Sequence, residues 1–397
     1  MDSYALLKFF WAGILCVLLI GVGIMVGMDM GVGTLLRFVG RNDGERRTAL
    51  NIIGPHWDGN QVWFILGGGA IFAAFPTLYA TSFSVFYVVM IALLFSMILR
   101  PVAFEYRSKV DNRVWKASWD WVFLISGFLP MFIYGAAFGN VLEGVGYHFD
   151  WTGQYHQDQS FLLYLINPFA ILCGILAVAL SVYQGGTMLM LRAEEPIYGR
   201  ARRYATRAGW ISAALFALGG FWIRHTVGYV LNAGGDPGMV ADPLHGQHVI
   251  RVSGGWLTHY ANYPVLWIVP LAGIVCMITG PVFLRADRPT LAWWTGAGAW
   301  TATISTVGIA MFPFFMPCST RPDESLTIWN SSASAYGLTC MLVVAAVFVP
   351  LILTYTSWCF YIMRVLFRAR RVITFCCRLS TGAVPCRTQP TSRFSRR

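Results

Sequence analysis

Long apolar stretches separated by short polar connections run along most of the chain. A helix needs about 20 apolar residues to cross the hydrocarbon core of a bilayer. The pattern predicts nine such helices, at residues 9–36, 61–79, 83–104, 119–142, 160–183, 208–231, 263–284, 291–316 and 334–363. We therefore expect an all-α polytopic membrane protein built as a helix bundle, with no separate soluble domain.

Composition supports this class of protein. Hydrophobic residues make up 56% of the chain and charged residues 12%, and the mean hydropathy is +0.58. Soluble domains carry about 25% charged residues, so a soluble enzyme is excluded. The apolar run at residues 9–26 has no small-residue cleavage site after it, which predicts a retained helix rather than a signal peptide.

The basic residues are distributed unevenly along the chain. Fifteen Lys and Arg residues lie in the odd-numbered connections between predicted helices, whereas the amino end and the even-numbered connections hold four. Because basic connections stay on the cytoplasmic side, we expect an external amino end and a cytoplasmic carboxyl end. The net charge of +11 is thus explained by topology, and no nucleic-acid partner is expected.

Residues 368–397 differ in character from the membrane domain predicted at residues 1–367. They are rich in Ser, Thr, Pro and Arg and lack an apolar period, which predicts a disordered, basic cytoplasmic tail close to anionic lipid. The nine cysteines show no metal-binding spacing. Those that lie singly in apolar runs are interpreted as packing residues.

The segment Asn51–Trp63 places polar and aromatic residues ahead of an apolar run. Gly54 and Pro55 break any preceding helix, so Asp58 should lie where the next helix begins, near a membrane surface. One interpretation makes Asp58 a helix cap beside an interfacial tryptophan. The other makes it the opening of a polar path into the membrane, because ionisable groups at hydrocarbon edges are often functional.

Other charged residues also lie within predicted helices. Asp29 follows the first apolar run among glycines that allow another backbone to approach closely. Arg100 and Glu105 flank Pro101 at the inner end of the third helix. A cation at that depth needs a partner, and Glu105, Asp58 or Asp29 are candidates. The alternative is a snorkelling arginine whose head reaches the membrane surface.

Runs of glycine and several histidines are further candidates for functional sites. Glycines at residues 67–69 and 185–186 indicate close helix packing rather than a phosphate loop, because the required spacing and lysine are absent. Four histidines, His225, His245, His248 and His259, fall in or near the sixth connection, and no inward pair suited to binding haem is predicted.

Four sequence strings resemble a known family. They are RNDGERR at 41–47, PHWDGNQVW at 55–63, RPVAFEYRSK at 100–109 and GIAMFPF at 308–314. In this order they resemble subunit II of the cytochrome bd-type quinol oxidases of bacteria, and the resemblance extends from near the amino end to about residue 363.

The resemblance implies a partner and an activity. Subunit II of that family pairs with a similar subunit I, which carries the ligands of haems b558, b595 and d and the quinol-oxidising loop. The complex, which includes small single-span accessory subunits, oxidises ubiquinol, reduces O2 to water and generates proton-motive force in the bacterial inner membrane. The resemblance implies that this chain ligates no haem or metal and holds no catalytic residue.

The resemblance also suggests roles for individual residues. Asp58, with Trp57 and Gln61, resembles the cytoplasmic entrance of the family's proton path, and Trp63 resembles the aromatic residue beside its O2 route. Three further positions match residues with a role in assembly or at the subunit interface: Asp29, Arg100 and Glu105. The family usually has a second acid where this chain has Val26, so a role that needs two carboxylates on the first helix is not expected.

Two other functions are alternatives. A transporter would show solute uptake by the chain alone in liposomes, but paired interrupted helices in corresponding halves are not evident in the sequence. A haem-bearing cytochrome b subunit would show a haem spectrum that is lost on replacing one histidine.

Overall fold

The structure is a computed structural model that describes residues 3–158, 166–238, 240–242, 244 and 247–380, with side chains to residue 362. The chain divides into two compact units, residues 1–346 and 347–397. The first unit holds every predicted site residue, and the boundary between the units falls within helix α13.

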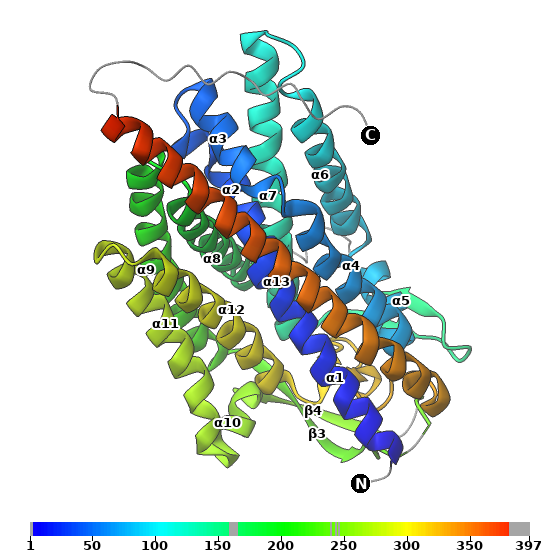
Figure 1. Cartoon of the computed structure of the whole chain (residues 1–397). Coiled ribbons are helices and arrows are strands. Elements are labelled where there is room, and N and C mark those ends of the chain that lie inside the picture. The colour runs from blue at the N-terminus through cyan, green and yellow to red at the C-terminus, as the bar shows by residue number, and fades with distance from the viewer. Residues whose placement is uncertain (1–2, 159–165, 239, 243, 245–246, 381–397) are drawn as a thin grey trace. The chain divides into compact units, whose positions relative to one another are not determined.

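Helices make up most of the first unit (Figure 1). In chain order the helices are α1 Ser3–Gly21, α2 Gly27–Val39, α3 Asp43–Ile53, α4 Trp57–Ala74, α5 Pro76–Val85, α6 Tyr87–Tyr106, α7 Arg113–Glu143, α8 Pro168–Arg192, α9 Ile197–Ile223, α10 Thr258–Asn262, α11 Ile268–Arg285, α12 Pro289–Met311 and α13 Ala335–Ser380. A π-helical segment, Val22–Val26, joins α1 to α2, and three short 3-10 helices cover Gly255–Leu257, Pro264–Trp267 and Pro322–Glu324.

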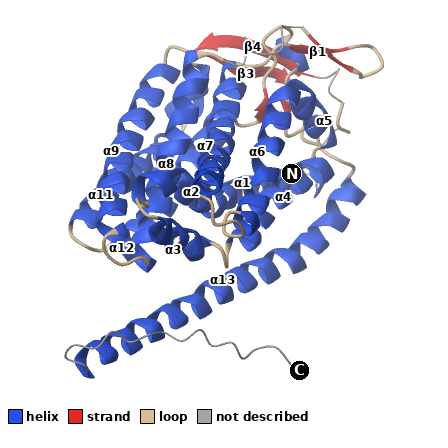
Figure 2. Ribbon diagram, turned by 90° about the horizontal axis from the view of Figure 1, so that it is seen from above, coloured by secondary structure: helices blue, strands red, loops and turns tan. Residues whose placement is uncertain are grey.

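Three antiparallel two-stranded sheets correct the all-α prediction. They pair β1 Tyr147–Phe149 with β2 Tyr155–Gln157, β3 Val227–Gly234 with β4 Gln247–Ser253, and β5 Phe314–Met316 with β6 Leu326–Thr327. Figure 2 shows the strands gathered at one end of the helices. The predicted span 208–231 is wrong at its end, because α9 stops at Ile223 and β3 follows. The span 291–316 likewise overruns α12 into β5.

Six helical segments of the described chain are long and apolar enough to cross a membrane. They are Ser3–Val39, Tyr87–Tyr106, Arg113–Glu143, Pro168–Arg192, Pro264–Arg285 and Ala335–Ile362. The remaining three predicted spans fall on α4 with α5, on α9 and on α12, so the number nine stays a prediction. Residues 160–165 of the fifth predicted span lie outside the described residues.

The second predicted span is two helices rather than one. Phe75, at the junction of α4 and α5, has an extended φ of −134° and ψ of 67°, and Pro76 begins α5. Proline excludes the α conformation from the residue before it, which ends α4 one residue earlier. The break was visible in the sequence at Phe75-Pro76.

Glycines bring α2, α7 and α8 into backbone contact. A Cβ atom on Gly185 of α8 would lie 2.5 Å from the carbonyl carbon of Gly31 in α2, and one on Gly127 of α7 would lie 2.5 Å from the carbonyl oxygen of Met30. The predicted close packing at Asp29 and at residues 185–186 is confirmed. The prediction of close packing is wrong for Gly68 and Gly69, because a Cβ atom added at either residue would have no neighbouring atom within 4 Å.

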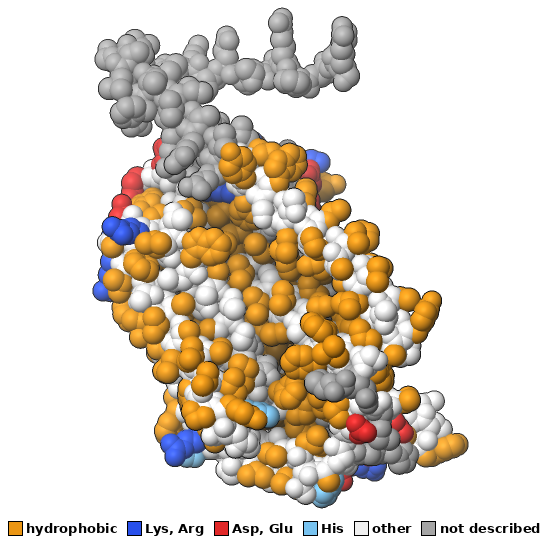
Figure 3. Space-filling view, turned by 60° about the horizontal axis from the view of Figure 1, so that its bottom comes forward, with side chains coloured by type: hydrophobic (Ala, Val, Ile, Leu, Met, Phe, Trp, Pro, Cys, Tyr) orange, Lys and Arg blue, Asp and Glu red, His pale blue; other side chains and the backbone are white. Residues whose placement is uncertain are grey.

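The connections collect at two ends of the first unit. Ion pairs join the first, third and fifth connections at one end, and the strands and their loops lie at the other. On the face shown in Figure 3, hydrophobic side chains dominate and charged side chains gather toward the ends. This separation fits a protein whose middle is surrounded by lipid.

Helix α13 continues as far as Ser380, past the predicted domain boundary at residue 367. Residues 381–397 of the predicted tail lie outside the described residues. The division of the chain at residue 367 therefore stays a prediction.

Candidate functional site

The site begins where α4 starts. His56 is the cap residue of α4, and Asp58 lies in the first helical turn with its side chain exposed. No side chain makes a capping hydrogen bond at this helix start. The interpretation of Asp58 as a mere helix cap is therefore wrong. An exposed carboxylate in a first helical turn is instead favoured by the helix dipole.

His56 fastens the start of α4 to α8. Its side chain is 3% exposed, and its Nε2 atom contacts Nη1 of Arg192. The same Nη1 atom donates a hydrogen bond to the carbonyl oxygen of Ile52 at 3.4 Å. Burial, and then the positive charge of Arg192, lower the pKa of His56 from 6.5 to about 4. His56 is thus neutral at physiological pH and serves as an acceptor for Arg192.

The depressed pKa of His56 predicts how stability depends on pH. Because the folded protein resists protonation of His56, the contribution is complete above pH 6.5 and declines as the pH falls from 6.5 toward about 4. The loss amounts to about 3 kcal/mol. We expect His56→Gln to flatten this part of the profile of melting temperature against pH, measured on the purified complex.

The matched control for this measurement is His156→Gln, because the His156 side chain is 51% exposed in the β1–β2 hairpin. Its profile should follow that of the unmodified protein between pH 4.5 and 7. A profile for His56→Gln that falls as steeply as that of the unmodified protein would show that His56 does not carry the effect.

Trp57 and Gln61 lie near Asp58 on α4. The indole of Trp57 stacks on Phe104 of α6, with ring centroids 5.2 Å apart and planes at 8°. Gln61 is three residues after Asp58 and four after Trp57, so all three share one side of the helix. Its Nε2 atom is buried without a hydrogen-bond partner among the described residues. This side of α4 therefore presents a carboxylate, an indole and a free amide donor.

A second polar group, centred on Asp29, lies inside the helices. Nδ2 of Asn60 donates to Oδ2 of Asp29 at 2.9 Å, which links the first turns of α4 to α2. Arg100 of α6 is 1% exposed, and its Nη1 atom contacts the Met30 sulfur at 3.0 Å. The charges of Asp29 and Arg100 attract each other. Asp29 and Arg100 thus lie close enough for their charges to interact, although they form no ion pair.

The other proposed partners of Arg100 are excluded by their position. Glu105 and Asp58 are exposed, and neither forms an ion pair within the described part of the chain. The snorkelling interpretation is also wrong, because Arg100 is buried. Oδ1 of Asp29 and two nitrogen atoms of Arg100 have no hydrogen-bond partner among the described residues.

Trp63 lies deeper along α4 and is 4% exposed. A Cβ atom on Gly21 would overlap its indole ring, so the absence of a side chain at Gly21 makes room for Trp63 just before the π-helical segment. Trp63 belongs to a hydrophobic cluster that also contains Leu176, Trp300 and Ile304. The surroundings of Trp63 are therefore apolar.

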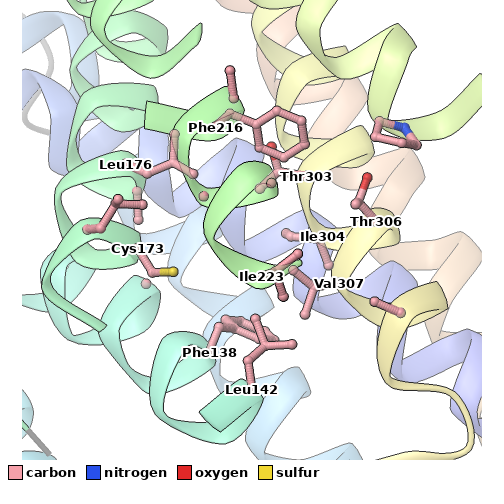
Figure 4. A pocket seen from close by; sticks show the side chains of 18 of the residues that line it. Phe138, Leu142, Cys173, Leu176, Phe216, Ile223, Thr303, Ile304, Thr306 and Val307 are labelled. Carbon is pink, nitrogen blue, oxygen red and sulfur yellow. The ribbon is translucent and has the colours of Figure 1, made fainter. Parts of the chain in front are cut away.

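A cavity of about 340 Å³ lies on the other side of that cluster. Side chains from α7, α8, α9 and α12 surround it, among them Phe138, Leu176, Phe216 and Ile304 (Figure 4). Its described lining contains no charged residue, histidine or methionine. The cavity suits apolar molecules.

An ionic cluster at the same end as Asp58 was missed by the sequence reasoning. Asp120 of α7 is 0% exposed and forms ion pairs with Arg46 and Arg107, each at 2.7 Å. The available signal was a carboxylate at the edge of the predicted span 119–142. The sequence could not supply its partners, which lie 13 and 74 residues away.

Comparison with known proteins identifies the family. The family model described as cytochrome bd terminal oxidase subunit II matches residues 7–363. The chain belongs to this family. Over 370 residues it is 42% identical to cytochrome bd-I ubiquinol oxidase subunit 2 of Escherichia coli (strain K12). The matched region covers 91% of this chain and 96% of the relative.

A further relative supports the same family, and a solved structure supports the fold. The chain is 40% identical over 358 residues to a probable cytochrome oxidase subunit 2 of Haemophilus influenzae, covering 90% of this chain and 94% of the relative. One chain of the bd oxidase structure from Geobacillus thermodenitrificans superimposes with a TM-score of 0.62 at 12% identity, covering 93% of this chain and 100% of that one. This subunit II protein is a membrane protein of the bacterial inner membrane.

The four histidines in or near the predicted sixth connection of this subunit II chain have different surroundings. His248 contacts Asp323, and His259 contacts the carbonyl oxygen of Phe312. His225 packs on Phe221, and His245 lies outside the described residues. No group of three or more His, Cys, Asp or Glu residues in the described chain is placed to hold a metal ion. The expectation that this chain ligates no haem stays a prediction.

Proposed function

We propose that this chain is the subunit II of a membrane complex that oxidises ubiquinol, reduces O2 to water and generates proton-motive force. Its relative in Escherichia coli carries the name of a bd-I ubiquinol oxidase subunit. The complex contains a haem-bearing subunit I, which ligates haems b558, b595 and d, and small single-span accessory subunits. This chain supports subunit I and acts only within the complex as part of a translocase.

The polar residues at the start of α4 supply protons to that chemistry. The observation that carries this proposal is the position of Asp58, an exposed carboxylate at the end of the unit where the basic connections meet. By the distribution of positive charge this end faces the cytoplasm. A proton that binds Asp58 moves past Trp57 and Gln61 and then passes to subunit I, since hydrocarbon does not conduct a bare proton.

Subunit I docks along α4 and α6 in this proposal. Side chains on α6 such as Leu94, Phe95 and Ile98 are 56 to 66% exposed, and Ile65 on α4 is 73% exposed. An apolar face that adjoins Asp58 provides a short route between the two subunits. Glu105, exposed at the end of α6, lies at the rim of this interface.

The buried residues Asp29 and Arg100 serve assembly from within the chain. Their mutual attraction and the bond from Asn60 connect α2, α4 and α6. Removing one charge leaves the other buried without compensation, which costs several kcal/mol. The two residues thereby hold α4 and α6 in the arrangement that subunit I contacts.

Oxygen uses a different route from protons. O2 is apolar and needs only a hydrophobic corridor, and Trp63 lies in the apolar cluster that borders the cavity described above. The proposed O2 route therefore passes Trp63.

Purification of the tagged chain from a membrane in which subunit I is present or absent tests the proposal. With subunit I we expect a larger haem-containing companion, a haem spectrum and ubiquinol oxidase activity. Without it we expect neither haem nor activity. Activity of the chain alone would contradict the proposal, and saturable solute uptake by the chain alone would favour a transporter.

A further inference from the structure

A carboxylate shielded from solvent lies between two arginines near the end of the unit that carries Asp58. Oδ1 of Asp120 accepts a hydrogen bond from Nε of Arg107, and Oδ2 accepts one from Nη1 of Arg46, each at 2.7 Å. Arg107 also forms an ion pair with Asp43 at 2.9 Å. We call Asp43, Arg46, Arg107 and Asp120 the Asp120 cluster.

The Asp120 cluster joins three elements. Asp43 and Arg46 lie in the first turns of α3, Arg107 follows the last residue of α6, and Asp120 lies near the start of α7. Figure 1 shows α3 at the same end of the structure as the start of α7. Of these elements, α3 is the only one too short to cross a membrane, with 11 residues.

Charges hold the first half of α3 in place. Its buried residues, Ala49, Leu50, Ile52 and Ile53, all lie in the second half. The first half is attached through the Asp120 cluster on one side and through an ion pair of Glu45 with Arg200 of α9 on the other, at 2.6 Å. The orientation of this short helix therefore depends on ionic contacts.

Helix α3 leads directly to Asp58. Only Gly54, Pro55 and His56 separate the end of α3 from the start of α4. Beyond Asp58 the chain is fixed by the hydrogen bond of Asn60 to Asp29. Within the connection, His56 contacts Arg192 of α8. A change in the tilt of α3 must therefore displace this contact before it reaches Asp58.

We propose that the Asp120 cluster positions Asp58 for proton entry, with Asp120 as the positioning residue. The proposal rests on the proposed role of Asp58. Without the Asp120 carboxylate, the partly exposed guanidinium group of Arg46 and the buried one of Arg107 lose the negative charge between them, and Arg107 keeps only its ion pair with Asp43. This is unfavourable for the buried Arg107. Helix α3 relieves the repulsion by moving away from α6 and α7, and Asp58 moves with it.

Thiol labelling at residue 58 tests the position directly. In the complex that carries Asp58→Cys, the reaction with a membrane-impermeant maleimide in inside-out vesicles is measured at residue 58 by peptide mass spectrometry. Adding Asp120→Asn should change the labelling rate by about tenfold, as expected for local opening. Adding Asp120→Glu, which keeps the charge, should restore most of the original rate.

The matched control for labelling is Asp111→Asn. Asp111 is 99% exposed and pairs with Lys116 at the rim of the same charged region, so its removal changes the net charge equally but leaves the Asp120 cluster intact. If Asp120→Asn does not assemble, Arg46→Gln is the alternative variant. It removes the ion pair of Arg46 with Asp120, and the Arg46 side chain is 22% exposed. An unchanged labelling rate in an assembled Asp120→Asn or Arg46→Gln complex would overturn the proposal.

Turnover provides the second test. Asp120→Asn should lower turnover per haem by about tenfold, and combining it with Asp58→Leu should lower turnover no further than Asp58→Leu alone, because both changes act on one step. Multiplying effects would show that Asp120 acts elsewhere. Full turnover in Asp58→Leu would refute proton entry at Asp58. The labelling rate would still show whether Asp120 positions residue 58, because labelling does not depend on proton entry.

Discussion

Replacement of Asp58 by leucine is expected to lower ubiquinol oxidase turnover per haem by about a hundredfold in the assembled complex. Asp58 is exposed and has no ion-pair partner in the described chain, so its loss removes a proton acceptor and leaves the packing of α4 unchanged. Leucine can neither bind nor pass a proton. Turnover is measured as ubiquinol-dependent O2 consumption with an oxygen electrode.

Asp58→Glu is the control for the Asp58→Leu experiment. Glutamate keeps the carboxylate in the first turn of α4, so this variant should retain at least about a third of the turnover. Haem content is determined in the same samples, because a complex that fails to assemble also loses activity. Equal and full turnover in both variants, at normal haem content, would exclude Asp58 from proton entry.

Gly185→Leu is expected to abolish accumulation of the haem-containing complex. A Cβ atom at this position would lie 2.5 Å from the carbonyl carbon of Gly31 and 2.5 Å from the amide nitrogen of Val32. Both obstacles are backbone atoms, so α2 and α8 must separate, at a cost of about 3 kcal/mol or more. The change also displaces Asp29, which lies two residues before Gly31 in α2.

Gly13→Leu is the matched control for this prediction. Gly13 lies in α1, where a Cβ atom would meet nothing within 4 Å. This variant should accumulate to the level of the unmodified complex, as judged by haem absorbance of solubilised membranes. Normal accumulation of Gly185→Leu would show that the crossing of α2 and α8 is looser than the structure indicates.

The sequence predicted the membrane helices well where an apolar run ends at polar residues. The ends of α6 and α11 agree with the predicted spans 83–104 and 263–284 within a few residues. The predicted ends of spans 208–231 and 291–316 were wrong, because β3 and β5 continue the apolar run of the helices before them. Hydropathy measures preference for an apolar environment, and strands that are buried only in part, such as β3, still contain enough apolar residues to extend the apolar run.

The candidate site was predictable in part. The local sequence around Asp58 predicted a helix start, because Gly54 and Pro55 have strong local effects. The bond between Asn60 and Asp29 and the contact between His56 and Arg192 join residues 31 and 136 positions apart. Such contacts depend on how the helices pack, which a single sequence does not specify.

Glycine patterns illustrate the same limit. The run of glycines at residues 67–69 and the pair at residues 185–186 look alike in sequence, yet only the second pair lies at a backbone crossing. In lipid, small residues permit close approach, but the partner helix decides whether an approach takes place.

Protons reach the redox chemistry of the complex through Asp58 in the function proposed here. Proton uptake during a single oxidation of the fully reduced complex by O2 tests it most directly, with the complex in liposomes and a pH indicator on the side of the basic connections. We expect Asp58→Leu to slow uptake about a hundredfold at unchanged haem content. Uptake at the unmodified rate, or uptake from the opposite side of the membrane, would contradict it.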